Sequence, residues 1–182
     1  MKIYTKTGDK GLTVLGNGKK ATKSSLRVQV YGNIDELNST IGVIVSTTSN
    51  KQEAISKELI EIQKDLFEIG ASLSDSKKAD KDLTDYLKPR VLDFEKIIDL
   101  LSRELPNLNH FILPGGGRSG SLLHLVRTIC RRVERKIVEL DKNETVNKQI
   151  IVYLNRLSDL LFVMARSVNL KEKKKEIVWF KK

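Results

Sequence analysis

The chain has 182 residues, of which 33 are Lys or Arg and 23 are Asp or Glu, so its formal charge is +10. With 40% hydrophobic and 31% charged residues, the composition is typical of a single globular domain and excludes a disordered chain. No apolar run reaches the ~20 residues of a membrane span, and the first residues lack the apolar core of a secretion signal. We therefore expect a cytoplasmic protein without a membrane partner.

The residues that bind metals and form disulfides are scarce. Cys130 is the single cysteine, and His110 and His124 are the two histidines, so an internal disulfide, a Cys-based metal site and a histidine-rich metal cage are excluded. Residues 1–50 include seven basic and three acidic residues, and residues 101–182 include seventeen basic and eight acidic residues. This asymmetry fits a nucleic-acid binder, a pocket for a polyanionic small molecule or a solvated basic face, and charge alone does not choose among them.

The first 30 residues are rich in Gly, Lys and Thr and predict an irregular leader. Two short extended pieces are expected in it, one at Val14 and Leu15 and one at the alternating Leu26, Val28 and Val30. Helical spacing begins only afterwards. Asn33 is the predicted N-cap of the first helix, with Glu36 completing a capping box.

Four more helices are predicted from the recurrence of apolar residues at steps of three and four. The second helix is expected over 51–73, and an exposed loop over 74–82 follows it. The third helix is expected to begin after Pro89, with Leu92 on its apolar face, and to stop at Pro106. An extended piece over 111–113 then precedes helices over 121–140 and 146–170. The charge run 171–175 is interpreted as a frayed, solvated helix end.

Five helices with short connections predict an all-α helical bundle. We expect one domain over residues 1–182, with a leader (1–30), the bundle (33–170) and a charged tail (171–182).

The last two helices carry polar rows that a bundle core does not need. Arg127, Arg131 and Arg135 stand four apart, so they share a face and repel each other unless an anion or carboxylates lie against them. The planar guanidinium suits phosphate or carboxylate, whereas a solvated face balanced by nearby Glu residues is the simpler alternative. Further polar residues share faces on the fifth and first helices: Asn155, Asp159, Phe162 and Arg166 on the fifth, Asp35 and Asn38 on the first.

Two glycine segments offer unobstructed backbone N–H groups to a phosphate. One is 5–11 (TKTGDKG), and the other, 115–117, leads into a predicted helix N-terminus. Gly18 and Lys19 are followed by Lys20 rather than Ser or Thr, so a conventional P-loop is excluded.

Taken together, these segments resemble the PduO-type ATP:cob(I)alamin adenosyltransferases over essentially the whole chain. The resemblance rests on blocks that agree in order and spacing: 3–11 (IYTKTGDKG), 31–38 (YGNIDELN), 111–116 (FILPGG) followed by 123–135 (LHLVRTICRRVER), 153–162 (YLNRLSDLLF), and the late Val178 and Trp179.

The resemblance implies a homotrimeric five-helix bundle with active sites at the subunit interfaces. It implies transfer of the 5′-deoxyadenosyl group of ATP to the cobalt of a reduced corrinoid, cob(I)alamin, giving adenosylcobalamin and triphosphate. By motif, the residues carried over for ATP are Thr5, Lys6, Thr7, Gly8, Thr13 and Lys23 from the leader, with Arg131, Arg132, Glu134, Arg135 and Asn155 from the bundle. Mg²⁺ is expected mainly on the ATP phosphates, with Glu134 as a candidate ligand.

On the corrinoid side, the resemblance implies that Asp35 and Arg127 pair across the interface and that Phe111 presses on the lower face of the corrin. Without the resemblance, Phe111 is more simply a core aromatic. Because cobalt(I) is itself the nucleophile, the absence of a catalytic base or a Ser-His-Asp set is expected. A flavoprotein reductase and an adenosylcobalamin-dependent enzyme are the implied partners, and nucleic acid is not.

One segment departs from the family pattern. Residues 117–120 (GRSG) carry Gly117 and Gly120 where the family usually has Ser or Thr and a small Ala, so we expect different capping of the fourth helix. Two alternatives stay open at this point: a non-catalytic basic helical module that binds nucleic acid or an acidic partner, and a corrinoid chaperone that binds ATP without turnover.

Overall fold

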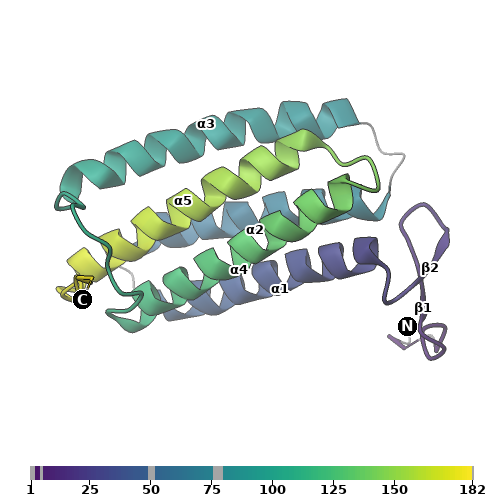
Figure 1. Cartoon of the computed structure of the whole chain (residues 1–182), viewed down its shortest axis with the longest axis horizontal. Coiled ribbons are helices and arrows are strands. Elements are labelled where there is room, and N and C mark those ends of the chain that lie inside the picture. The colour runs from purple at the N-terminus through teal and green to yellow at the C-terminus, as the bar shows by residue number, and fades with distance from the viewer. Residues whose placement is uncertain (1–2, 5, 49–51, 76–79, 182) are drawn as a thin grey trace.

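The computed structural model describes residues 3–4, 6–48, 52–75 and 80–181. Within these residues a two-stranded hairpin precedes five long helices, which confirms the predicted all-α bundle (Figure 1). The elements are β1 Leu12–Val14, β2 Lys20–Thr22, α1 Leu26–Thr47, α2 Glu53–Ser74, α3 Asp80–Glu104, α4 Arg118–Asp141 and α5 Lys148–Lys171.

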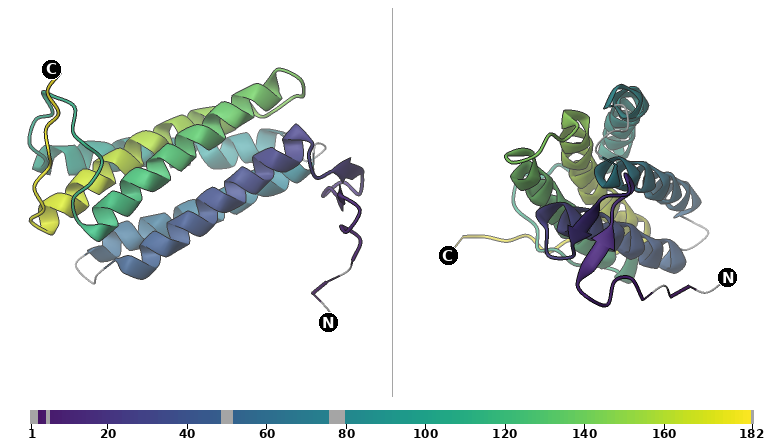
Figure 2. Two further views of the ribbon diagram at one scale, coloured as in Figure 1. Left: turned by 60° about the horizontal axis from the view of Figure 1, so that its bottom comes forward. Right: turned by 90° about the vertical axis from the view of Figure 1, so that its right-hand side faces the viewer.

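The helices pack side by side and close into a ring. α1 contacts α2 and α4, α5 contacts α4 and α3, and α2 completes the ring against α3. The leader lies at one end of the bundle, whereas the α3–α4 connection and the C-terminus lie together at the other (Figure 1; Figure 2). None of the described helices combines the length and hydropathy that a membrane crossing needs.

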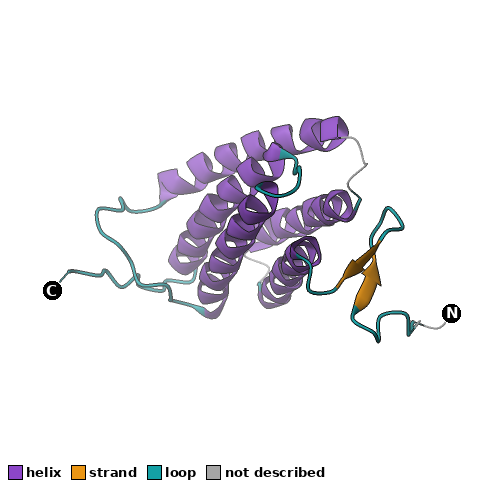
Figure 3. Ribbon diagram, turned by 45° about the vertical axis from the view of Figure 1, so that its right-hand side comes forward, coloured by secondary structure: helices purple, strands orange, loops and turns teal. Residues whose placement is uncertain are grey.

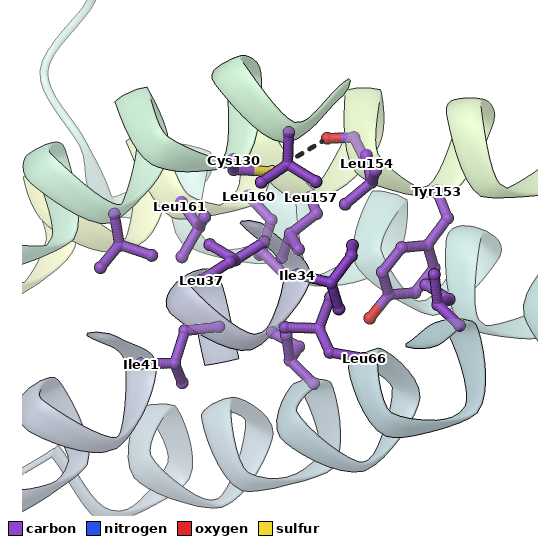
Figure 4. Packing of buried hydrophobic residues seen from close by; sticks show 14 of the residues in the cluster. Ile34, Leu37, Ile41, Leu66, Cys130, Tyr153, Leu154, Leu157, Leu160 and Leu161 are labelled. Carbon is purple, nitrogen blue, oxygen red and sulfur yellow. Dashed lines mark hydrogen bonds between the residues drawn. The ribbon is translucent and has the colours of Figure 1, made fainter. Parts of the chain in front are cut away.

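The apolar stripes of α2 and α5 meet in the middle of the ring. The predicted core residues of α5, from Ile150 to Met164, are all buried, as are those of α2 from Ile55 to Leu73. Figure 4 shows this packing, in which the Cys130 thiol donates to the carbonyl of Leu154 at 3.3 Å. Each fully buried aliphatic side chain contributes about 1.5–3 kcal/mol to the stability of the fold. Because these buried residues are the ones that recur at steps of three and four in the sequence, helical periodicity predicts both helices.

A polar cluster centred on the buried Asp65 joins α2, α3 and α5, and we call its members the Asp65 hub: Glu58, Asp65, Tyr86, Arg90 and Tyr153. Asp65 is 1% exposed and accepts from the hydroxyls of Tyr86 and Tyr153, both at 2.7 Å, and from Arg90 Nε at 2.8 Å. Arg90 also donates to Glu58 at 2.7 Å. Burial and the hydrogen bond to Asp65 raise the pKa of Tyr86 to about 12, so its hydroxyl stays a donor.

α1 begins seven residues before the predicted N-cap, at Leu26. The predictions of a strand over Leu26 to Val30 and of a cap at Asn33 are therefore wrong. Ser25 is the N-cap residue, and the Asn33 side chain donates to the carbonyl of Gln29 within the helix. The apparent alternation arises because Arg27 is itself buried, where it donates to Glu144 and to the carbonyl of Leu73.

α3 begins at Asp80, and Pro89 lies inside it, so the predicted start after this proline is wrong. Pro89 is exposed on the outer face of α3, and it cannot donate the backbone hydrogen bond that a helix-interior residue normally makes. The buried stripe runs through Leu83, Leu87, Val91 and Phe94, and Leu92 is exposed rather than part of the apolar face. Tertiary packing thus overrides the proline signal. Residues 76–79 of the predicted loop lie outside the described residues.

The chain after α5 makes specific contacts. The N–H of Leu113 donates to the carbonyl of Ile177 at 2.8 Å, and the N–H of Trp179 donates to the carbonyl of Phe111 at 2.7 Å. The lysines of the charge run 171–175 are exposed at the end of α5, as predicted, whereas the chain beyond them is bound to the α3–α4 connection. The predicted extended piece over 111–113 pairs antiparallel with this tail.

Candidate active site

The predicted arginine row lies on the outward face of α4, opposite its buried stripe. Arg131 and Arg135 are exposed and Arg127 is half-buried. The basic side chains of α4 that form described ion pairs are instead Arg132 and Lys136. Among the described residues, Arg127, Arg131 and Arg135 form no ion pair, so three like charges stand one turn apart on α4, which favours an anionic ligand.

Arg127 sits at the seam between α4 and α5. Its guanidinium lies 5.9 Å from the centre of the Phe162 ring, and its Nε is buried with no partner among the described residues. Burial, and then the charge of Arg131, lower the pKa of Arg127. A polar or anionic group brought against this face would relieve both effects.

Glu134 and Asn155 continue the same seam. The Asn155 amide donates to Glu134 Oε1 at 3.2 Å, which links the arginine row of α4 to the polar face of α5. Asp159 pairs with Arg156 at 3.3 Å. Arg166 lies further along α5, where its side chain is 7% exposed and bound to Glu176.

Arg132 points toward α1 rather than toward α5. It pairs with Glu36 at 2.7 Å, with both side chains nearly half exposed. A contact with ATP would therefore require Arg132 to leave Glu36 or to bind the nucleotide from the α1 side.

Asp35 lies on another side of the bundle from Arg127. It lines a cavity of about 290 Å³ between α1 and α2, together with Tyr31, Asn38 and Phe67. Within the described part of one chain, Asp35 and Arg127 form no ion pair, since one faces α2 and the other faces α5.

The leader forms a compact turn and hairpin at the N-terminal end of α1 (Figure 3). Lys6 has a positive φ of 61°, and a Cβ placed on Gly8 would lie 3.0 Å from Lys23 Nζ, so Lys23 covers the glycine turn. Thr7 is exposed, and Thr13 is half-buried in β1 opposite Ala21. The structure thus gathers the leader residues named from the sequence, apart from Thr5, which lies outside the described residues.

Phe111 is 79% exposed in the α3–α4 connection, which excludes a core role. The centre of its ring lies 6.4 Å from the centre of the Trp179 ring of the tail, and the two rings meet edge-on. An exposed aromatic held at its backbone by a second segment is placed to contact a large apolar ligand.

At the N-terminus of α4, the glycine segment 115–117 is in contact with side chains from the C-terminal end of α5 and the residue after it. The Asn169 side chain accepts from the N–H of Gly117 at 3.0 Å and donates to the carbonyl of Gly115 at 2.9 Å. Cβ atoms on Gly117 and Gly120 would lie 2.1 Å from Glu172 Oε2 and Asn169 Oδ1, respectively. The two glycines that depart from the family pattern therefore leave space for Asn169 of α5 to cap the N-terminus of α4. The nearby Glu172 carboxylate would repel an anion at this helix end.

The residues present fit Mg²⁺ held mainly by phosphates. No group of three or more potential metal ligands occurs among the described residues, and Glu134 offers one carboxylate beside the arginine row. Mg²⁺ commonly binds through one or two carboxylates together with substrate phosphates.

Comparisons with known proteins agree with this geometry. A family model described as cobalamin adenosyltransferase matches residues 3–168. The chain belongs to the cobalamin adenosyltransferase family. A corrinoid adenosyltransferase of Bacillus subtilis is 47% identical over 93% of this chain and 87% of its own, and a cobalamin adenosyltransferase of Cupriavidus metallidurans is 42% identical over 98% and 94%.

Solved structures of the same family superpose closely. A variant PduO-type ATP:corrinoid adenosyltransferase from Lactobacillus reuteri, complexed with cobalamin and ATP, has a TM-score of 0.92 at 35% identity and covers 99% of this chain and 100% of its own. Another variant of that enzyme, complexed with ATP, has a TM-score of 0.90 at 39% identity, covering 98% and 100%. The predicted resemblance is confirmed.

Some residues around this site were missed from the sequence. Glu176, which pairs with Arg166, and Asn169, which accepts from the N–H of Gly117, form contacts between segments that are distant in the chain. The apolar cluster 177–180 (IVWF) directly after the charge run was the available signal that the tail packs against something.

Proposed function

We propose that this protein transfers the 5′-deoxyadenosyl group of ATP to the cobalt of a reduced corrinoid and releases triphosphate. The observation that carries the proposal is the row of Arg127, Arg131 and Arg135 on α4, which forms no ion pair within the described part of the chain and lies beside Glu134 and Asn155. Such a row supplies a fixed positive field for the charge that develops on the leaving triphosphate.

On the ATP side, Arg131 and Arg135 bind the triphosphate, and Asn155 contacts the nucleotide. The glycine turn at Gly8, with Lys6 and Lys23, wraps the ATP from the leader. Mg²⁺, when bound, neutralises phosphate charge, and Glu134 supplies at most one of its ligands. Binding both reactants in line makes the reaction effectively unimolecular, so the entropy cost of bringing them together is met on binding. Because cobalt(I) is itself the nucleophile, the protein does not need to supply a general base.

On the corrinoid side, Phe111 presses on the lower face of the ring and disfavours the axial ligand. A four-coordinate cobalt is the easier one to reduce to the nucleophilic state. Arg127 completes this side, and its unpartnered buried Nε supports a role in binding a polar group there.

The active enzyme is a homotrimer with its sites between chains. Asp35 and Arg127 lie on different sides of one chain, and the leader stands at the end of the bundle opposite the α3–α4 connection, which contains Phe111 (Figure 1). Two chains together bring these groups to one site, whereas one chain does not. The cytoplasmic location, a flavoprotein reductase and an adenosylcobalamin-dependent enzyme remain predictions.

A spectroscopic assay with ATP, Mg²⁺ and chemically reduced cobalamin tests this function. We expect formation of adenosylcobalamin and release of one triphosphate for each transfer. Neither product forming would refute the enzymatic function. ATP consumption without adenosylcobalamin would refute the transfer itself.

A further inference from the structure

Arg166 on α5 joins three segments that are distant in the chain. Its Nε and Nη2 donate to the two carboxylate oxygens of Glu176 at 2.9 and 3.1 Å, and Nη2 also donates to the carbonyl of Pro106 at 2.9 Å. The Arg166 side chain is 7% exposed and that of Glu176 is 22% exposed. A two-pronged ion pair is directional, and removing one partner of a largely buried pair leaves the other charge without compensation.

The residue after Glu176 is the first residue of the tail segment that pairs with the segment containing Phe111. The carbonyl of Ile177 accepts from Leu113, and the N–H of Trp179 donates to the carbonyl of Phe111. The ion pair therefore fixes the start of the tail one residue before the tail engages the Phe111 segment. Through Pro106, it also fixes the other end of the same connection.

Besides its backbone hydrogen bonds, this short ladder is joined by two aromatic contacts, Phe111 with Trp179 and His110 with Phe180, whose ring centres lie 6.4 and 5.1 Å apart. Its side chains at Ile177, Trp179 and Phe180 are 45–67% exposed, and Phe111 opposite is 79% exposed. An isolated two-stranded ladder is marginally stable in water, and segments with exposed hydrogen bonds open most readily. The ion pair at its base differs from these contacts because it is largely buried.

We propose that Arg166 and Glu176 are positioning residues for Phe111, acting through the tail. The proposal deepens the function proposed above, because it rests on Phe111 contacting the corrinoid. Without the ion pair, the tail separates from the Phe111 segment, and the ring loses its fixed place. The reaction with the corrinoid is then impaired, whereas ATP binding on the α4 face is unchanged.

The chain contains a single tryptophan, Trp179, so its fluorescence reports the tail directly. We expect Glu176→Ala to lower the fluorescence anisotropy of Trp179 in the absence of any substrate. The matched control is Lys175→Ala, which removes a neighbouring exposed charge and leaves the anisotropy unchanged. Unchanged anisotropy in Glu176→Ala would overturn the proposal, and this readout does not depend on enzymatic activity.

The kinetic test separates positioning from general stability. We expect Glu176→Ala to reduce turnover about ten-fold or more, with loss of the four-coordinate cob(II)alamin signal and an ATP KM within about two-fold of wild type. Arg166→Gln should give the same pattern, and the double variant should be no worse than the stronger single one. Equal losses for ATP and corrinoid, or additive effects, would contradict the proposal. If Arg166→Gln does not fold, Glu176→Ala alone decides.

Discussion

The Asp65 hub and the α4 arginine row are both clusters of charged residues in one bundle, yet they are built in opposite ways. In the hub, a buried carboxylate meets three donors at hydrogen-bond distance. In the row, Arg131 and Arg135 are exposed and stand beside Arg127 without a described ion pair. Buried polar groups must be paired to be tolerated, whereas exposed charges need not be. The hub is therefore expected to determine stability and the row to determine activity.

The largest expected effect on stability comes from breaking the hub. Asp65→Ala leaves the hydroxyls of Tyr86 and Tyr153 without their acceptor, and Arg90 with Glu58 alone. We expect a loss of about 3–5 kcal/mol in the free energy of unfolding, measured by chemical denaturation. Glu61→Ala, which removes an exposed partner of Lys64 on the same helix, should cost under about 1 kcal/mol. Equal losses in the two variants would remove the distinction.

Phe111→Ala tests the opposite case, an exposed side chain with a role in activity. We expect turnover to fall by roughly 10²-fold through lost positioning, with loss of the four-coordinate cob(II)alamin signal in electronic spectra. The ATP KM and the melting temperature should stay close to wild type. Leu100→Ala, which truncates an exposed apolar residue of α3, is the control. An unchanged signal in Phe111→Ala would rule out its contact with the corrin.

A smaller effect is expected at His124, which is 2% exposed beside the row and has no described partner for either ring nitrogen. Burial, and then the charge of Arg127, lower its pKa below 6.5. The unfolded chain then binds this proton more readily, so the contribution of His124 to stability is lost as pH falls below about 6.5. Nearby Glu176 opposes the shift only in part.

His124 and His110 are the two histidines, so an NMR titration with His110→Gln assigns the signal. We expect His124 to titrate below 6.5 and its pKa to rise in Arg127→Ala. A pKa at or above 6.5, or no response to Arg127→Ala, would show that the row does not act on this ring.

Sequence patterns predicted what repeats locally. The apolar stripes of α2 and α5 and the arginine row follow from spacing along one helix, and so they were found. Partners of the Asp65 hub lie up to 88 positions apart, and nothing local marks them. The start of α3 was missed because Pro89 is tolerated only where its face of the helix is exposed, which depends on the fold. Pairing of the tail with the Phe111 segment was missed for the same reason.

Arg131→Ala, compared with Lys136→Ala on the same helix, tests the central claim most directly. Both remove one positive charge from α4, but Lys136 pairs with Glu139 away from the row. We expect Arg131→Ala to lower the rate of adenosylcobalamin formation roughly 10²- to 10³-fold without changing the melting temperature, and Lys136→Ala to retain wild-type turnover. Wild-type turnover in Arg131→Ala, or an equal loss in both variants, would contradict a catalytic role for the arginine row.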